Sequence, residues 1–294
     1  MACRANASAA DSVACPKNLL IVGPGVLGSY LGKLWLERYP AARVVGQTNS
    51  DASHDRLRTL NIQPRTKDVA GTENFPFVVF AAPPSGSTDY VAEVKAALQL
   101  WSGEGTFLYT GSAGIYATED GSQVDERSAT VQLGKDDRTD RQLLVEEAVL
   151  DAGGCVVRLA GLYHAQRGAH TFFLKMGKVG RWAGYTVNLI HYEDAAELAA
   201  AILRGDGSSE FYRGRVFLGA DGAPLTFQEM MDATIASGAY EGAVEFTGSE
   251  NSVKGKLLNN SATRGDLQWS PRYSSYQAFM AAGARDWYTD SGLF

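Results

Sequence analysis

The chain has 294 residues, of which 45% are hydrophobic and 20% are charged, and its formal net charge is −6. These values are ordinary for a globular protein and exclude the broad positive surface that nucleic acid or an anionic membrane would require. No apolar run reaches the roughly 20 residues of a membrane helix, so we expect no membrane insertion. Cys3, Cys15 and Cys155 form no C-x-x-C pair, which favours a reducing compartment.

The first 16 residues are rich in alanine and serine and have no strand or helix periodicity. Such a composition predicts a flexible N-terminal segment. The stretch "CRANASA" is similar to the end of a plant chloroplast transit peptide. The chloroplast stroma and the cytoplasm are therefore the two locations that we expect.

From residue 17 onward, strand-like and helix-like segments alternate. An apolar strand at 18–23 leads through a glycine-rich turn into a helix at 26–39. Further strands are predicted at 42–48, 75–86, 105–116, 155–163 and 214–219. Helices are predicted between them at 53–62, 89–101, 140–154 and 192–207. This alternation predicts an α/β fold, a doubly wound parallel Rossmann sheet covered on both faces.

The predicted sheet divides the chain into a core and a smaller lobe. Residues 17–162 form the NAD(P)-binding core, and residues 191–219 join it. The less regular segments 163–190 and 220–294 follow the late strands, where ligands enter such sheets. We expect these two segments to form a small C-terminal substrate lobe.

The glycine-rich turn has the pattern G-x-G-x-x-G, formed by Gly23, Gly25 and Gly28. Between a strand and a helix this pattern predicts a dinucleotide site, because the glycines allow a tight turn and a close approach to pyrophosphate. The first N–H groups of the helix would face the phosphates. The alternative is a turn kept for packing alone. The cofactor contacts predicted here are Gly23, Pro24, Gly25, Val26, Leu27 and Gly28.

The end of the second strand indicates which cofactor binds. An acidic residue there would hold the adenosine ribose of NAD. The chain instead has four uncharged polar residues, Gln47, Thr48, Asn49 and Ser50. Asp51 is one step further on, and Arg56 and Arg58 follow on the next helix. We therefore expect NADP rather than NAD, with Thr48, Asn49 and Ser50 at the adenosine end.

Several segments, in this order, resemble the short-chain dehydrogenase/reductase superfamily in its extended and atypical, epimerase/dehydratase-like branch. "IVGPGVLGSYL" resembles the cofactor turn, and "VVFAAPPSG" resembles the fourth strand. "FLYTGSAGIY" is similar to the serine-bearing strand, and "VVRLAGLYHAQRG" and "NLIHYEDAAELAAAIL" to later motifs. The resemblance implies that Ala81, Ala82 and Pro83 line the cofactor site.

The resemblance also implies a Ser, Tyr, Lys constellation in which the tyrosine is the general acid or base. Ser112 matches the serine. Arg138 and Gln142 stand where the Tyr-x-x-x-Lys pair is expected, which argues against the usual carbonyl-reductase mechanism and makes Gln142 a cofactor contact. Other candidates for the proton step are Tyr116, Tyr163, His164 and His191.

Three functions follow from this pattern. The first is an NADP(H)-dependent oxidoreductase acting on a small carbonyl or hydroxyl substrate, without the usual Tyr/Lys pair. The second is a non-catalytic NADP(H)-binding redox sensor or scaffold subunit. The third, an isomerase or lyase, is disfavoured because those branches use the same missing pair. No Cys/His spacing predicts a metal site, and a homodimer is possible because the resembling family often dimerises.

Overall fold

The computed structural model describes residues 17–69, 71, 73–85, 87–205, 212–250 and 253–291, so the predicted flexible segment 1–16 lies outside the described residues. Within that part of the chain, seven strands form a parallel sheet in the order β12-β7-β5-β4-β1-β2-β3. The predicted fold class is confirmed. The strands are β1 (Leu19–Val22), β2 (Val44–Thr48), β3 (Gln63–Thr66), β4 (Phe77–Phe80), β5 (Phe107–Ser112), β7 (Cys155–Leu159) and β12 (Val216–Gly219).

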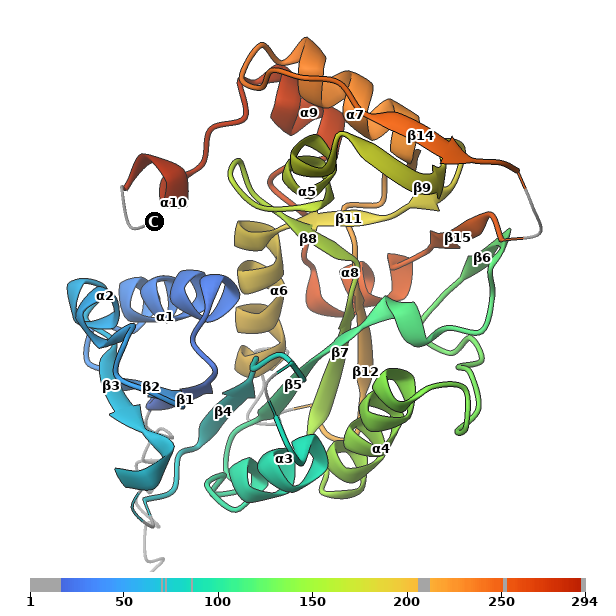
Figure 1. Cartoon of the computed structure of the whole chain (residues 1–294). Helices are drawn as coiled ribbons and strands as arrows, with labels where there is room; N and C mark the ends of the chain where they lie inside the picture. The colour runs from blue at the N-terminus through green and yellow to red at the C-terminus, as the bar shows by residue number, and fades with distance from the viewer. Residues whose placement is uncertain are drawn as a thin grey trace, which may run out of the picture.

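Helices cover both faces of this sheet. Helices α1 (Val26–Arg38) and α6 (Tyr192–Arg204) lie side by side on one face, and α3 (Tyr90–Leu98) and α4 (Asp137–Asp151) lie on the other (Figure 1). The strand residues alternate between the two cores, as Leu19 and Ile21 join the α1/α6 core and Leu20 joins the α3/α4 core. This double burial explains the continuous apolar runs. No described helix has the length and apolarity needed to cross a membrane.

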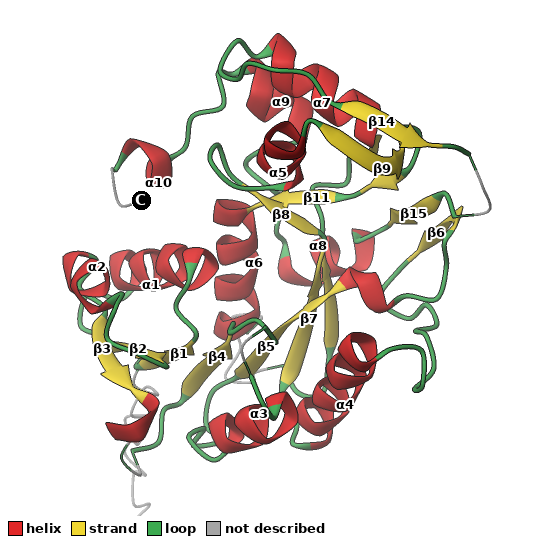
Figure 2. Cartoon of the chain, viewed as in Figure 1, coloured by secondary structure: helices red, strands yellow, loops and turns green. Residues whose placement is uncertain are grey.

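The smaller lobe stands beyond the carboxyl ends of the strands (Figure 2). It contains α5 (Ala169–Met176), β9 (Lys178–Trp182), α7 (Phe227–Ala236), β14 (Glu245–Gly248) and α9 (Tyr276–Ala281). Its own core includes Phe173, Met230 and Phe279. Helix α7 begins with a capping box, in which Thr226 and Glu229 each accept a hydrogen bond from the other's backbone N–H.

Short strands connect the lobe to the core. β8 (Gly161–Tyr163) pairs with β11 (Leu189–His191). A separate sheet has the order β13-β10-β15-β6, with β13 (Leu225–Thr226), β10 (Thr186–Val187), β15 (Gly255–Leu258) and β6 (Asp120–Val124). The remaining helices are α2 (His54–Thr59), α8 (Ser261–Leu267) and α10 (Trp287–Asp290), with 3-10 turns η1 (Lys67–Val69) and η2 (Ala113–Ile115).

Two parts of the predicted sheet differ from the structure in more than the ends of a strand. The strand expected at 155–163 breaks at Ala160, after which β8 leaves the central sheet for β11. Edge strand β3 was not among the predicted strands. It contains Pro64, and a proline, which lacks an N–H, is tolerated only at a sheet edge or bulge.

Candidate cofactor and active site

A cavity of about 1140 Å³ opens at the carboxyl ends of β1 and β4. The strand order reverses between these two strands, which is where ligands bind in doubly wound sheets. All residues that the sequence predicts as cofactor contacts lie on the wall of this cavity: residues 23–28, 48–50 and 81–83, and Gln142. Ser112 lines the same cavity.

The three glycines of the turn have different surroundings. Gly23 has φ +76°, and a Cβ on it would lie 2.4 Å from the backbone of Ala82. A Cβ on Gly28 would lie 2.8 Å from Ile21 Cγ2, so these two glycines pack the turn against the sheet. A Cβ on Gly25 would meet nothing within 4 Å. The turn therefore leaves open space beside Gly25, at the start of α1.

At the adenosine end, the β2 tip carries uncharged polar groups. Gln47 accepts a hydrogen bond from Arg65 Nε at 3.0 Å, and the Thr48 hydroxyl lies 2.9 Å from His54 Nε2. Asn49 and Ser50 are exposed. No described residue forms a hydrogen bond with either of their side chains, and both residues line the cavity. Asp51 is not on the cavity wall.

Two arginines of α2 have different environments. Arg56 lines the cavity and donates to the Pro24 carbonyl at 3.2 Å, to Ser29 Oγ at 3.1 Å and to the Tyr288 hydroxyl. Arg58 lies outside the cavity wall and pairs with exposed Asp55 at 2.6 Å. Of the two, only Arg56 is placed to reach a ligand in the cavity.

At the other end of the cavity, Ser112 follows β5 directly. Its Oγ accepts a hydrogen bond from the Gly114 N–H at 3.1 Å, so its own O–H remains able to donate to a ligand. Arg138 and Gln142 also line the cavity, one turn apart on α4. Arg138 and Gln142, which stand where the resemblance predicts Tyr and Lys, thus line the same cavity as Ser112.

A buried ion pair supports this end of the site. Glu146 of α4 accepts from Arg158 Nη2 of β7 at 2.8 Å and from its Nε at 3.1 Å. Burial raises the pKa of Glu146, and the charge of Arg158 opposes that rise. A Cβ on Gly111 would come within 3.0 Å of Glu146 Oε1, so the pair lies directly behind the strand that carries Ser112.

The structure does not bring Tyr116, Tyr163 or His164 to the cavity wall. Tyr116 is fully buried, with the Arg158 guanidinium 4.9 Å from the centre of its ring. Tyr163 packs in the lobe core, 4.9 Å from the ring of Tyr276, and burial raises its pKa. These three side chains are buried against other parts of the protein, although each was predicted to face a ligand at the end of a strand.

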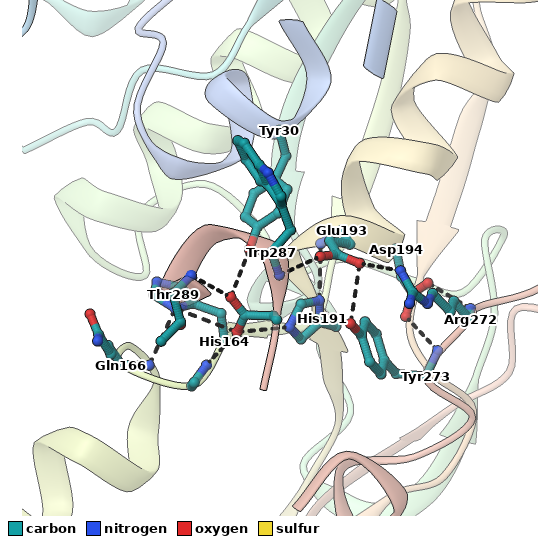
Figure 3. Close-up of polar contacts among 12 residues, drawn as sticks. Tyr30, His164, Gln166, His191, Glu193, Asp194, Arg272, Tyr273, Trp287 and Thr289 are labelled. Atoms are coloured by element: carbon teal, nitrogen blue, oxygen red, sulfur yellow. Dashed lines mark hydrogen bonds and ion pairs between the residues drawn. The ribbon is translucent and has the colours of Figure 1, made fainter. Parts of the chain in front are cut away.

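His164 and His191, both labelled in Figure 3, belong to a buried network around the Asp286 carboxylate. The Asp286 carboxylate accepts from the Ala165 N–H at 2.9 Å and from the Tyr30 hydroxyl at 3.2 Å, and it lies 3.5 Å from His191 Nε2. Burial would raise the pKa of Asp286, but the neighbouring His191 ring and the backbone hydrogen bonds hold it below its usual range. Burial lowers the pKa of His164 to about 4, despite the Asp286 charge.

His191 therefore has a structural position. Its Nδ1 accepts from the Glu193 N–H at 3.1 Å and caps the start of α6. Among the described residues, no group of three or more His, Cys, Asp or Glu side chains is arranged to hold a metal ion.

One cavity-lining residue, Tyr192, was missed by sequence reasoning. The Tyr192 hydroxyl accepts a hydrogen bond from Arg167 Nε at 3.2 Å, and both side chains line the cavity. Burial raises the pKa of Tyr192, against the effect of the Arg167 charge. The only sequence signal was the position of Tyr192 directly after "NLIH", at the end of a strand.

Comparisons with solved structures identify the fold. The chain is similar to a functionally unknown conserved protein from Silicibacter pomeroyi (TM-score 0.72, 19% identity, 90% of this chain and 97% of that one). It is also similar to UDP-glucuronic acid 4-epimerase from Bacillus cereus in complex with NAD, with a TM-score of 0.71 and 14% identity over 94% of this chain and 100% of that one. A third similar structure is dTDP-glucose 4,6-dehydratase from Bacillus anthracis in complex with NAD, with a TM-score of 0.69 and 12% identity over 94% of this chain and 97% of that one.

The chain therefore shares the fold of this epimerase and this dehydratase. No protein-family model and no curated protein sequence matches it. The similarity to these three structures extends over 90–94% of this chain and 97–100% of theirs. It therefore includes the lobe as well as the central sheet.

Proposed function

We propose that this protein is an atypical member of the extended short-chain dehydrogenases/reductases that binds NADP(H) and reduces or oxidises a small carbonyl or hydroxyl substrate. The observation that carries the proposal is the glycine turn at the sheet reversal, opening on a cavity with Ser112 on its wall. Residues 23–28 would hold the pyrophosphate, and Ala81, Ala82 and Pro83 would flank the dinucleotide.

The preference for NADP over NAD is supported by the charge at the adenosine end. No carboxylate stands at residues 47–50 to repel a 2′-phosphate, and Arg56 lines the cavity beside the turn. The side chains of Asn49 and Ser50 are available as hydrogen-bond donors. A cationic guanidinium with adjacent neutral donors suits a phosphate better than a ribose hydroxyl pair.

At the reactive end, a bound nicotinamide would accept or deliver hydride. We assign Ser112 to hold the substrate oxygen through its free O–H. Tyr192 is the phenol with a cation partner on the cavity wall, and its raised pKa keeps it protonated at neutral pH. We assign it the proton that a reduced carbonyl oxygen must receive. Gln142 would contact the cofactor through its amide.

One observation favours a second function, a non-catalytic NADP(H)-binding sensor or scaffold. Arg138 and Gln142 occupy the cavity wall where the resemblance predicts Tyr and Lys. Neither side chain can exchange a proton at neutral pH. Tight binding of NADPH without oxidation by any member of an aldehyde and ketone panel would support this second function.

Substitution of Gly25 tests the cofactor site itself. Because a Cβ at this position meets no protein atom, Gly25→Val should fold with a melting temperature within a few degrees of the wild type. The valine side chain would occupy the space assigned to pyrophosphate. We expect NADPH binding, measured by calorimetry, to weaken at least about 100-fold, equivalent to about 2.7 kcal/mol.

The control is Gly28→Val, which places its Cβ against Ile21 and should lower the melting temperature as well as the affinity. Wild-type protein that binds neither NADPH nor NADH at millimolar concentration would overturn the proposed function. Gly25→Val protein that binds NADPH as tightly as the wild type would show that the pyrophosphate lies elsewhere.

A further inference from the structure

The segment around α10 packs against the cofactor side of the molecule, far along the chain from the glycine turn. Tyr288 is fully buried, and its ring lies 5.0 Å from the ring of Tyr30 on α1. Trp287 contacts the same ring edge-on at 5.5 Å. Asp286 is fixed by the Tyr30 hydroxyl and the Ala165 N–H. Tyr288 and the two residues before it are thus held against α1 and the Ala165 backbone.

The Tyr288 hydroxyl meets the cavity-lining arginine. Arg56 Nη1 donates both to this hydroxyl and to Ser29 Oγ, and Nη2 donates to the Pro24 carbonyl. A guanidinium has five N–H donors, so these three bonds use both hydrogens of Nη1 and one of Nη2. No described residue accepts from Nε or from the second Nη2 hydrogen, which leaves two donors for a ligand.

We propose that Tyr288 is a specificity-determining residue of the cofactor site, which positions Arg56 to bind the 2′-phosphate of NADP. This inference rests on the NADP preference proposed above. Tyr288 does not line the cavity and acts through Arg56, so it is a positioning residue.

The chemistry of the phenol suits this role. Burial raises the pKa of Tyr288, although the charges of Arg56 and Arg167 oppose the rise, so the hydroxyl stays neutral and accepts from Arg56. A long arginine side chain has many rotamers, and a fixed acceptor selects one of them before the ligand arrives. The selected orientation matters for a phosphate, which a guanidinium binds through paired N–H groups.

The test compares two cofactors that differ only in the 2′-phosphate. Dissociation constants for NADPH and NADH are measured by calorimetry on the full chain, for wild type and Tyr288→Phe. We expect Tyr288→Phe to weaken NADPH binding about tenfold and to change NADH binding less than about twofold. The matched control is Tyr185→Phe, which removes a hydroxyl bonded to Glu119 away from the cavity and should change neither constant.

A second variant keeps the test decisive if Tyr288→Phe folds poorly. Arg56→Lys keeps the charge but loses the paired donors, and it should reduce the NADPH preference about as much. In the double variant the losses should not add, because both act on one contact. An equal loss for NADPH and NADH in Tyr288→Phe, or unchanged NADPH binding in Arg56→Lys, would overturn the inference. If the wild type instead binds NADH more tightly than NADPH, the proposed cofactor preference is wrong. That result is distinct from a failure of the inference about Tyr288, which concerns the effect of the variants.

Discussion

Tyr192 and Arg167 form the cavity-lining pair on which the proposed proton step depends. Replacing Tyr192 with phenylalanine removes the only proton assigned to the substrate oxygen and leaves the ring packed against Tyr30. We expect kcat for NADPH oxidation with a carbonyl substrate to fall at least about 100-fold, while the NADPH dissociation constant changes less than about twofold. Unchanged kcat would remove Tyr192 from the mechanism and leave Ser112 in place.

Asp221 is a buried carboxylate outside the cavity. Its Oδ1 accepts from the Ala223 N–H at 2.9 Å, and its Oδ2 has no hydrogen-bond partner among the described residues. Burial raises its pKa to about 7, although backbone N–H groups and the charge of Arg264 oppose the rise. The folded protein therefore holds a proton here that the unfolded chain, with a pKa near about 3.9, releases.

This difference gives stability a pH dependence. Because the folded pKa of Asp221 is raised, its contribution is complete below about pH 4 and is lost as the pH rises to about 7. We expect the free energy of unfolding in urea to fall by roughly 2–3 kcal/mol more between pH 5 and pH 8 in wild type than in Asp221→Asn. Equal pH profiles for the two proteins would show that Asp221 is ionised throughout.

At the scale of elements, six of the seven strands of the central sheet could be predicted because they are largely buried and read as apolar runs between glycine and proline stops. Edge strand β3 could not, because it is short, polar and partly exposed. The short strands of the lobe, such as β9 and β14, could not, because they are half exposed and their partners lie far along the chain. β8 read as a continuation of β7, since both are apolar and only tertiary pairing separates them.

The candidate site divides in the same way. The glycine turn and the β2 tip could be predicted because each is one contiguous segment with a known geometry. The reactive end is assembled from α4, β5, β8 and α6, and sequence alone gave no means of judging which side chains reach it. Tyr163 ends β8 but packs in the lobe core, and His164 lies beside Asp286, whereas Tyr192, directly after β11, lines the cavity.

At the scale of the whole molecule, Asp286 connects parts that are distant in sequence. Its carboxylate binds Tyr30 of α1 and the Ala165 backbone after β8, and it lies beside His191 at the start of α6. The domain of the central sheet and the lobe therefore share one buried charge. Such a charge is costly to remove, because each of its partners is then left without an acceptor.

Asp286→Ala should lower the free energy of unfolding at pH 7 by about 3–5 kcal/mol, measured in urea. Because the folded pKa of Asp286 lies below its usual range, its contribution is present above about pH 4 and is lost as the pH falls further. The difference in the free energy of unfolding between Asp286→Ala and wild type should therefore decrease below about pH 4. The control Glu197→Ala breaks an exposed pair with Arg38 and should cost about 0.5 kcal/mol. Equal decreases in the free energy of unfolding for Asp286→Ala and Glu197→Ala would show that Asp286 does not act as a shared buried charge.

The bond between Arg56 and Tyr288 joins residues 232 positions apart. A chain growing on the ribosome can pair β1 with β2 and close the glycine turn from local segments alone, since contacts near in sequence form first. Arg56 acquires its phenol partner only after the intervening strands, helices and lobe have been synthesised. The proposed discrimination between NADPH and NADH would then be among the last properties that a newly made molecule gains.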